Sequence, residues 1–295
     1  HLTCACEHIN EKRGCASLNR FGEGMSLANA LRAKSITRIE GAAKIAVEQD
    51  YLAVEEPLEI RVGGRSVAVV MRTPGHDREL AAGFLVTEGI VRRRDDILDM
   101  VRCTSAEDVN RENILDVLLA DGAQVDLARL TRHVFTSSSC GICSKASIDA
   151  VQAQFPRIAE ACAPRRACVA ALPEQLRAGQ AAFAVTGGLH ASALFDLAGK
   201  LELVREDVGR HNALDKLIGH AFLADRLPLA PRILLVSGRV SFELMQKALA
   251  AGIPCVVAIS APTSAAVEFA EASGQTLIGF VRGDRMNVYA GTIME

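Results

Sequence analysis

The 295-residue sequence contains no apolar run that approaches the roughly 20 residues needed to cross a membrane. Its first residues lack the basic-then-apolar order of a secretion signal. Charge of one sign is not in excess either, because 33 Lys and Arg residues stand against 35 Asp and Glu residues. A nucleic-acid-binding surface would need a basic excess on one face. These absences predict a cytoplasmic protein that binds neither membranes nor nucleic acid.

Several nucleotide and metal motifs are also missing. Neither the phosphate-binding pattern G-x-x-x-x-G-K-[ST] nor the dinucleotide pattern G-x-G-x-x-G occurs, so the signatures of ATP hydrolysis and ordinary dinucleotide binding are absent. There is no H-x-E triplet, which zinc-dependent deaminases use beside their cysteine ligands. No internal repeat or low-complexity segment is present.

Cysteine occurs nine times, at irregular spacing, in a chain that is 49% hydrophobic. A chain of this length and composition can bury a full core without disulfides. The odd number and irregular spacing are therefore typical of a reducing cytoplasm and not of a secreted disulfide scaffold.

Three parts are predicted along the chain. Residues 1–40 lack sustained periodicity and are predicted to be a poorly ordered leader. Residues 41–135 are predicted to form a smaller N-terminal part with a β-hairpin and a helix, and residues 136–295 an α/β core. The leader contains four side chains that could bind metal, in no common zinc spacing: Cys4, Cys6, His8 and Cys15.

The N-terminal part is predicted from its alternation and turns. Apolar residues alternate on both sides of Gly63-Gly64, which indicates a two-residue hairpin turn. A helix is expected over residues 78–88, an irregular connector over 92–111, a strand over 113–120 and a short helix over 126–133.

The core is predicted to begin with a helix over residues 145–155. Another helix is expected from Pro173 to Val185, followed by a second hairpin between Ala193 and Arg205. A long helix then covers residues 209–225.

Three apolar runs follow in the last third, at residues 232–236, 253–259 and 276–281, with helices between them. Fully apolar strands that alternate with helices indicate parallel strands covered by helices on both faces. The predicted fold class is therefore α/β.

Cys140 and Cys143 stand where a loop with three serines, S-S-S-C-G-I-C, enters the helix expected from Lys145. A helix N-terminus lowers the pKa of a thiol and favours the reactive thiolate, and small neighbours leave the sulfur accessible. The pair can therefore carry sulfur or do thiol chemistry. Zinc binding with Cys162 and Cys168 is an alternative, although their C-x5-C spacing differs from structural zinc sites. A purely structural role is the third interpretation.

Several motifs together resemble the FdhD family, the formate dehydrogenase accessory sulfurtransferases. The matching segments are A-V-E-E-P-L from Ala53, R-T-P-G-H-D-R-E-L-A-A-G-F-L-V-T-E-G-I from Arg72, S-S-C-G-I-C-S-K, T-G-G-L-H from Thr186, E-D-V-G-R-H-N-A-L-D-K-L-I-G from Glu206 and F-V-R-G-D-R-M-N-V-Y from Phe280. The family loop usually reads C-G-x-C-G, and Ser144 stands in place of the last glycine.

The resemblance implies a cytidine-deaminase-like core without a metal of its own. It implies that Cys140 takes sulfur from a cysteine desulfurase as a persulfide, with Cys143 in support. The sulfur would pass to the molybdenum bis(molybdopterin guanine dinucleotide) cofactor, which apo-formate dehydrogenase then uses. We also expect a homodimer. The alternative function is a zinc-stabilised nucleotide-binding adaptor without sulfur transfer.

With the resemblance, we predict that the guanine-nucleotide part of this cofactor, or GDP as its mimic, binds at the carboxyl ends of the parallel strands. The opposing interpretation of its main segment, R-G-D-R, is an ordinary charged turn. The predicted binding residues are Phe280, Val281, Arg282, Gly283, Asp284, Arg285, Arg210, His211, Ser237 and Gly238.

Overall fold

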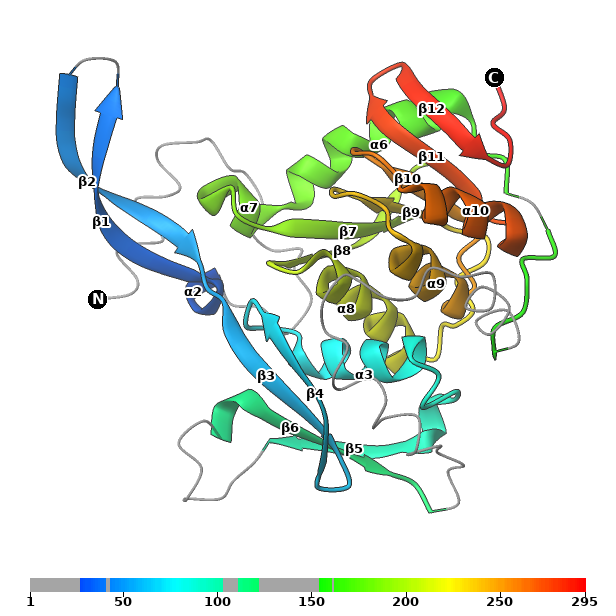
Figure 1. Cartoon of the computed structure of the whole chain (residues 1–295), viewed down its shortest axis with the longest axis horizontal. Helices are drawn as coiled ribbons and strands as arrows, with labels where there is room; N and C mark the ends of the chain where they lie inside the picture. Colours follow the sequence, from blue (N-terminus) through cyan, green and yellow to red (C-terminus); the bar gives the residue numbers. More distant parts are fainter. Residues whose placement is uncertain (1–26, 41–42, 103–110, 122–153, 161) are drawn as a thin grey trace.

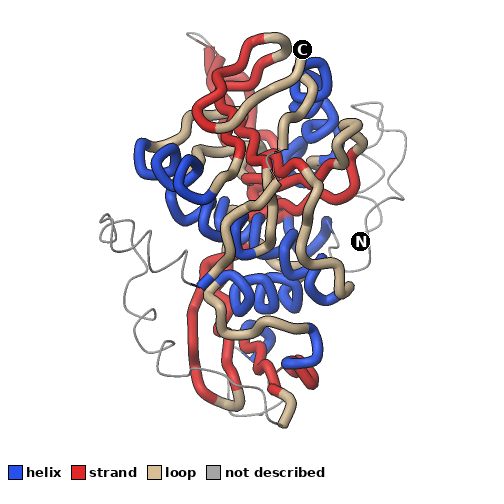
Figure 2. The backbone as a smooth tube through the Cα atoms, turned by 90° about the vertical axis from the view of Figure 1, so that its right-hand side faces the viewer, coloured by secondary structure: helices blue, strands red, loops and turns tan. Residues whose placement is uncertain are grey.

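The computed structural model describes residues 27–40, 43–102, 111–121, 154–160 and 162–295. The two larger of the three sheets lie on either side of a layer of helices (Figures 1 and 2). From the lower end of Figure 1, the layers are a four-stranded sheet, helix α3 (Asp77–Thr87), helices α8 (Arg210–Leu223), α9 (Phe242–Ala250) and α10 (Ser264–Ser273), a six-stranded sheet and helix α6 (Arg166–Gly179). Among the described helices, none is long and apolar enough to span a membrane.

The six-stranded sheet has the order β12-β11-β10-β9-β7-β8. Its strands are β7 (His190–Phe195), β8 (Leu201–Asp207), β9 (Ile233–Val236), β10 (Cys255–Ala258), β11 (Thr276–Arg282) and β12 (Arg285–Ala290). The three central strands β9, β10 and β11 are parallel, as predicted. The outer strands are antiparallel to their neighbours, and β7 and β8 form the predicted second hairpin. The sheet is therefore mixed, with a parallel centre.

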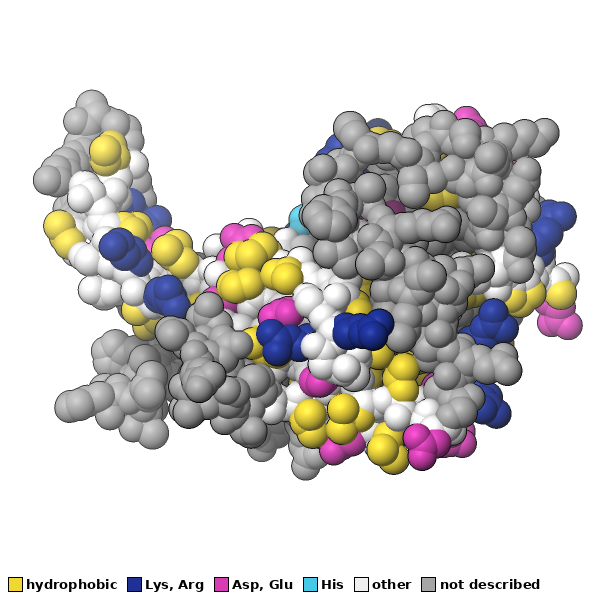
Figure 3. All heavy atoms as spheres, turned by 60° about the horizontal axis from the view of Figure 1, so that its bottom comes forward, with side chains coloured by type: hydrophobic (Ala, Val, Ile, Leu, Met, Phe, Trp, Pro, Cys, Tyr) yellow, Lys and Arg dark blue, Asp and Glu magenta, His cyan; other side chains and the backbone are white. Residues whose placement is uncertain are grey.

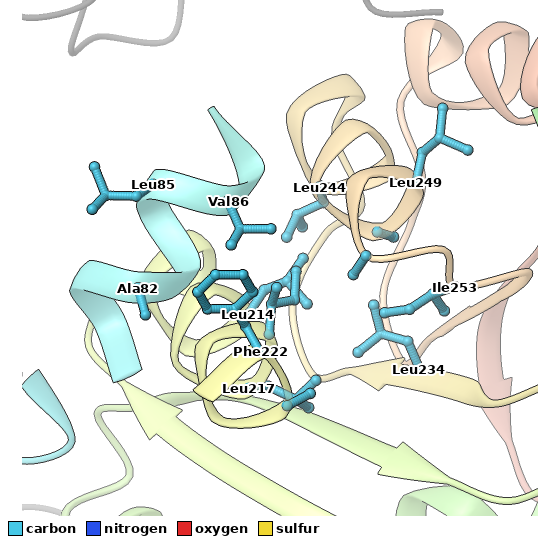
Figure 4. Packing of buried hydrophobic residues seen from close by; sticks show 14 of the residues in the cluster. Ala82, Leu85, Val86, Leu214, Leu217, Phe222, Leu234, Leu244, Leu249 and Ile253 are labelled. Carbon is cyan, nitrogen blue, oxygen red and sulfur yellow. The ribbon is translucent and has the colours of Figure 1, made fainter. Parts of the chain in front are cut away.

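Both faces of this sheet are covered. The helices are α6 (Arg166–Gly179), α7 (Ala181–Thr186), α8 (Arg210–Leu223), α9 (Phe242–Ala250) and α10 (Ser264–Ser273). In β9, Ile233 and Leu235 belong to the core cluster on the α6 side, whereas Leu234 and Val236 belong to the cluster formed with α8 to α10 (Figure 4). Successive side chains of a strand point to opposite faces, so a strand covered on both faces is apolar throughout.

The four-stranded sheet has the order β4-β3-β6-β5. Its strands are β3 (Glu56–Val62), β4 (Arg65–Arg72), β5 (Ile97–Arg102) and β6 (Ile114–Leu119), with 3₁₀ turns η1 (Arg94–Asp96) and η2 (Arg111–Asn113). The hairpin at Gly63-Gly64 is confirmed, and both glycines have positive φ angles of 56° and 78°. Figure 3 brings this lower end forward and shows hydrophobic side chains between charged ones on its surface.

The prediction of an irregular connector over residues 92–111 is wrong for its middle, which forms β5. In β5 only Ile97 and Met100 are buried, because a register irregularity separates Ile97 from Asp99. The buried residues are three apart, so the alternation that would have predicted a strand is absent.

Helix α3 (Asp77–Thr87) joins the two sheets by packing against α8. A Cβ atom at Gly83 would lie 1.8 Å from the carbonyl oxygen of Asp215, and one at Gly219 would lie 1.8 Å from that of Glu79. The two helices therefore touch backbone to backbone. The predicted helices over 78–88 and 209–225 are both confirmed.

The prediction of a poorly ordered leader is wrong for residues 27–40, which form α2 (Leu27–Ala30) and β1 (Leu31–Glu40). Strand β1 pairs with β2 (Ala43–Ala53) in an antiparallel ribbon that extends from the body in Figure 1. Most described side chains on both faces of β1 are exposed, so the sequence shows no alternation of apolar and polar residues there.

Helix α6 begins at Arg166, not at Pro173, which lies inside it. Val169, Leu172 and Leu176 form a buried stripe at helical spacing, and its burial outweighs the single hydrogen bond that proline removes. The helix over 126–133, the possible metal ligands of the leader and most of the helix over 145–155 lie outside the described residues. The likeness to cytidine deaminases and the boundaries at residues 40 and 135 stay predictions.

Candidate functional site

The predicted reactive cysteines, Cys140 and Cys143, lie outside the described residues, as does Ser144. The predicted nucleotide-binding residues all lie within them. The geometry of the site is therefore built from the carboxyl ends of the parallel strands and the start of α8.

Because β9, β10 and β11 are parallel, their carboxyl ends meet at one edge of the sheet. The loops that follow are joined there by backbone hydrogen bonds. Val240 donates its N–H to the carbonyl of Ala261 (3.1 Å), and Phe280 donates to that of Ser260 (3.1 Å). Ser237 and Phe280, predicted from distant motifs, thus lie along the same edge.

Four residues meet next to this edge and are called here the strand-end cluster: His190, Arg210, Ser237 and Gly238. A Cβ atom at Gly238 would lie 3.2 Å from Nδ1 of His190 and 3.7 Å from Cδ of Arg210. Ser237 Oγ accepts the N–H of Ala191 at 2.9 Å, which ties the loop to β7. Glycine at 238 therefore allows the backbone to approach the imidazole and the arginine closely.

The first turn of α8 is held by Asp207, which is fully buried. Its Oδ1 accepts the N–H of Gly209 (2.8 Å) and a side-chain N–H of Asn212 (3.0 Å). Its Oδ2 accepts the N–H of Thr73 (3.1 Å) and lies 2.6 Å from Lys216 Nζ. Asp207 thus connects α8 with the turn that precedes α3.

Donors at this helix start are available for an anion. The N–H groups of Arg210, His211 and Asn212 have no acceptor within the described part of the chain. Arg210 Nε is buried and is likewise without a hydrogen-bond partner there. A helix N-terminus carries positive potential, and an anion placed there would satisfy these donors.

Burial favours the neutral form of both histidines beside the start of α8. Burial, and then the charge of Arg210, lowers the pKa of His190, while Asp207 acts in the opposite direction. Burial lowers the pKa of His211 to about 3, with further contributions from Arg210, Lys247 and His190. His211 lies against α9, with Nε2 3.4 Å from Ser241 Oγ and 3.3 Å from the exposed Glu243.

The segment 280–285 divides into three environments. Phe280 is 43% exposed and has φ of 55°, a conformation that is strained for an aromatic residue. Val281 is buried in the core on the α6 side. Arg282, Gly283, Asp284 and Arg285 form the exposed β11–β12 turn. Within the described residues, no hydrogen bond or ion pair joins this turn to the strand-end cluster.

Sequence reasoning missed Thr73, Lys216 and Ser260. Thr73, in a turn distant in sequence, donates its N–H to Asp207, and Lys216, on the buried face of α8, forms an ion pair with it. No local spacing in the sequence indicates these two contacts. Ser260 could have been found, because it follows an apolar run predicted as a parallel strand.

In the described residues, no group of three or more His, Cys, Asp or Glu side chains could hold a metal ion. The four-cysteine zinc alternative stays untested, since it requires Cys140 and Cys143. The donors at the strand-end cluster, namely amide N–H groups and a guanidinium, suit an anionic ligand such as a phosphate.

Comparison with known proteins covers most of the chain. The model of the FdhD/NarQ family matches residues 53–293. A Mycobacterium tuberculosis protein named sulfur carrier protein FdhD is 52% identical over 256 residues, which cover 84% of this chain and 92% of that protein. A Streptomyces coelicolor protein of the same name is 51% identical over 265 residues, with coverages of 88% and 93%.

The fold is similar to a crystal structure from Desulfotalea psychrophila described as that of a formate dehydrogenase accessory protein. The TM-score is 0.66 at 22% identity, and the match covers 88% of this chain and 95% of the other. The match over residues 53–293 includes both sheets and the strand-end cluster. The chain therefore belongs to the FdhD/NarQ family.

Proposed function

We propose that this protein is a sulfur carrier that supports the activity of formate dehydrogenase. The main support is family membership, because relatives that are about 50% identical in sequence are named sulfur carrier protein FdhD. The loop S-S-C-G-I-C supplies the thiols that such a role requires.

The sulfur is carried as a persulfide on Cys140. The Cys140 thiolate attacks the terminal sulfur of a persulfide on a cysteine desulfurase, and the desulfurase cysteine leaves as a thiolate. Cys143, three residues later, supports this chemistry. The terminal sulfur then passes to the molybdenum bis(molybdopterin guanine dinucleotide) cofactor, which is the substrate and is used by apo-formate dehydrogenase. The transfer takes place in the cytoplasm, and the protein acts as a homodimer.

The guanine-nucleotide part of this substrate binds along the carboxyl edge of the parallel strands. The open N–H groups of α8 and the unpartnered Arg210 Nε favour phosphate oxygens. The exposed ring of Phe280 offers an apolar face for a base. The turn Arg282–Arg285 adds two guanidinium groups at the same edge.

The test is peptide mapping after incubation of the full chain with a cysteine desulfurase and cysteine. The loop peptide should gain the mass of one sulfur atom in wild type and in Cys143→Ala, but not in Cys140→Ala. Formate dehydrogenase activity should be lost with Cys140→Ala. Added sulfur that requires only Cys143 would reverse the two assignments.

The zinc-stabilised adaptor makes a different prediction. Near-stoichiometric zinc in the purified protein, lost together with the fold on chelation, would contradict sulfur transfer by this loop. Metal analysis of the same sample therefore separates the two functions.

A further inference from the structure

Two cysteine thiols lie together in the core, on the α6 side of the six-stranded sheet. Cys162 precedes α6, and Cys255 is the first residue of β10; both are buried and free. Both side chains belong to the same buried core cluster, and each thiol shifts the pKa of the other. A third thiol, Cys168 on α6, is partly buried and packs against the same cluster.

Thr276 on β11 is a neighbour of both cysteines. Thr276 Oγ1 donates a hydrogen bond to the carbonyl oxygen of Cys162 at 2.6 Å. Thr276 is also the Cα partner of Cys255 in the parallel β10–β11 ladder. Neighbouring strands are about 4.8 Å apart, so one β11 residue contacts the main chain of Cys162 and lies next to Cys255. A disulfide needs closeness of main chains as well as of sulfur atoms.

The two thiols differ in access and acidity. Cys162 is 8% exposed, whereas Cys255 is fully buried, so a small oxidant from solvent meets Cys162 first. Interaction with the Cys255 thiol lowers the pKa of Cys162, although burial acts in the opposite direction. The same interaction and burial raise the pKa of Cys255. Cys162 is therefore the nucleophile of the pair, since the thiolate is the reactive form.

We propose that Cys162 and Cys255 form an oxidisable dithiol that closes to a disulfide when hydrogen peroxide reaches Cys162. In the first step the Cys162 thiolate attacks a peroxide oxygen, the O–O bond breaks and the leaving hydroxide takes up a proton as water. Cys162 is then a sulfenic acid. In the second step the Cys255 sulfur attacks the Cys162 sulfur, the S–O bond breaks, and hydroxide leaves with the thiol proton as water. Two thiols are oxidised and one peroxide is reduced to two waters.

The disulfide would tie the chain before α6 to the centre of the sheet. Because it closes a long loop of the unfolded chain, it should raise the melting temperature of the oxidised protein. This modification site is separate from sulfur carriage on Cys140. A failure of either proposal leaves the other standing, because their readouts concern different peptides.

The experiment treats the full folded chain with hydrogen peroxide, alkylates free thiols and maps peptides without reduction. Wild type should yield a Cys162–Cys255 linked peptide, two hydrogen atoms lighter than the sum of its parts and absent after dithiothreitol. The melting temperature should rise on oxidation and return on reduction. Cys255→Ala should abolish the link and the rise, with Cys162 found as a sulfenic acid.

Cys168→Ser is the matched control, because it removes the neighbouring thiol of the same cluster. It should form the Cys162–Cys255 link as wild type does. A Cys162–Cys168 link in wild type, or thiols at 162 and 255 that both remain reduced in the folded protein, would overturn the proposal. Mapping of wild type decides this even if a variant fails to fold.

Discussion

The start of α8 and the turn Arg282–Arg285 stand at the same edge of the six-stranded sheet, and both contain arginine, yet they differ in nearly every physical respect. At the start of α8, Asp207 is fully buried and its two carboxylate oxygens are engaged by four groups. In the turn, Asp284 and both arginines are exposed. The first region is preorganised by the fold, so changes there affect stability and binding together. In the second, the exposed charged side chains can be altered with effects on binding alone.

The largest expected effect is the loss of stability in Asp207→Ala. Removing this carboxylate leaves Lys216, which is fully buried, without its counter-charge. Breaking a buried pair in this way costs about 3 to 5 kcal/mol. The carbonyl oxygen of Thr73, 2.8 Å from Lys216 Nζ, keeps the expected loss near the lower end.

Urea unfolding of Asp207→Ala and of its matched control Asp284→Ala measures this difference. The exposed control should stay within about 0.5 kcal/mol of wild type. Equal urea midpoints for Asp207→Ala and Asp284→Ala would contradict the prediction that the start of α8 contributes more to stability than the turn.

The second effect concerns GDP binding by Arg210→Ala and Arg285→Ala. Arg210 Nε is buried, and losing a hydrogen bond to a charged phosphate there should cost about 1.5 to 3 kcal/mol. Arg285 is exposed, so its contribution should be about 0.2 to 1 kcal/mol. Calorimetric titration of wild type and both variants gives the two losses. Wild-type affinity in both variants would exclude this edge as the nucleotide site.

The third effect is a dependence of stability on pH that originates in the first turn of α8. The pKa of His211 is lowered in the folded protein, so protonation favours unfolding. The stabilising contribution is complete above the unfolded pKa of about 6.5 and is lost as pH falls below it, by about 1 kcal/mol near pH 5.5. Glu243, 3.3 Å from Nε2, attracts the charged form but is exposed.

Denaturant unfolding between pH 7 and 5.5 measures this slope. His211→Gln should flatten it, because the titrating group is gone, whereas Asp284→Ala should leave it as in wild type. If His211→Gln leaves the pH dependence of the unfolding free energy unchanged, that dependence originates in another titrating group.

The smallest effects are expected for two glycines, Gly238→Ala and Gly283→Ala. Gly283 has φ of 54° and no atoms near its missing Cβ, so alanine should cost about 1 kcal/mol of stability from backbone strain alone. At Gly238 the new Cβ would press on His190, 3.2 Å away, and should weaken GDP binding. Denaturant unfolding and GDP titration of both variants test whether Gly283→Ala affects stability and Gly238→Ala affects binding. A GDP affinity that falls only in Gly283→Ala would contradict this assignment.

Local patterns predicted much of the fold. The three apolar runs became β9, β10 and β11, and the Gly63-Gly64 turn and the helices α3 and α8 were confirmed. The site was predicted less completely. Ser237, Gly238 and Arg210 lie together, but Val281 is part of the core and His211 lies against α9. Strand β5 and ribbon β1–β2 were missed because their burial does not alternate.

The sequence by itself determined most of the elements, because the period of buried residues along a strand or helix is a local property. It also determined the family, because several ordered motifs are specific together. Only the tertiary structure decided which distant groups meet. Thr73, Asp207 and Lys216 come from a turn, a strand end and a helix. The carbonyl oxygen of Cys162 accepts a hydrogen bond from Thr276, which is the partner of Cys255 in the β10–β11 ladder. Such contacts depend on helix packing and strand order, which no local spacing contains.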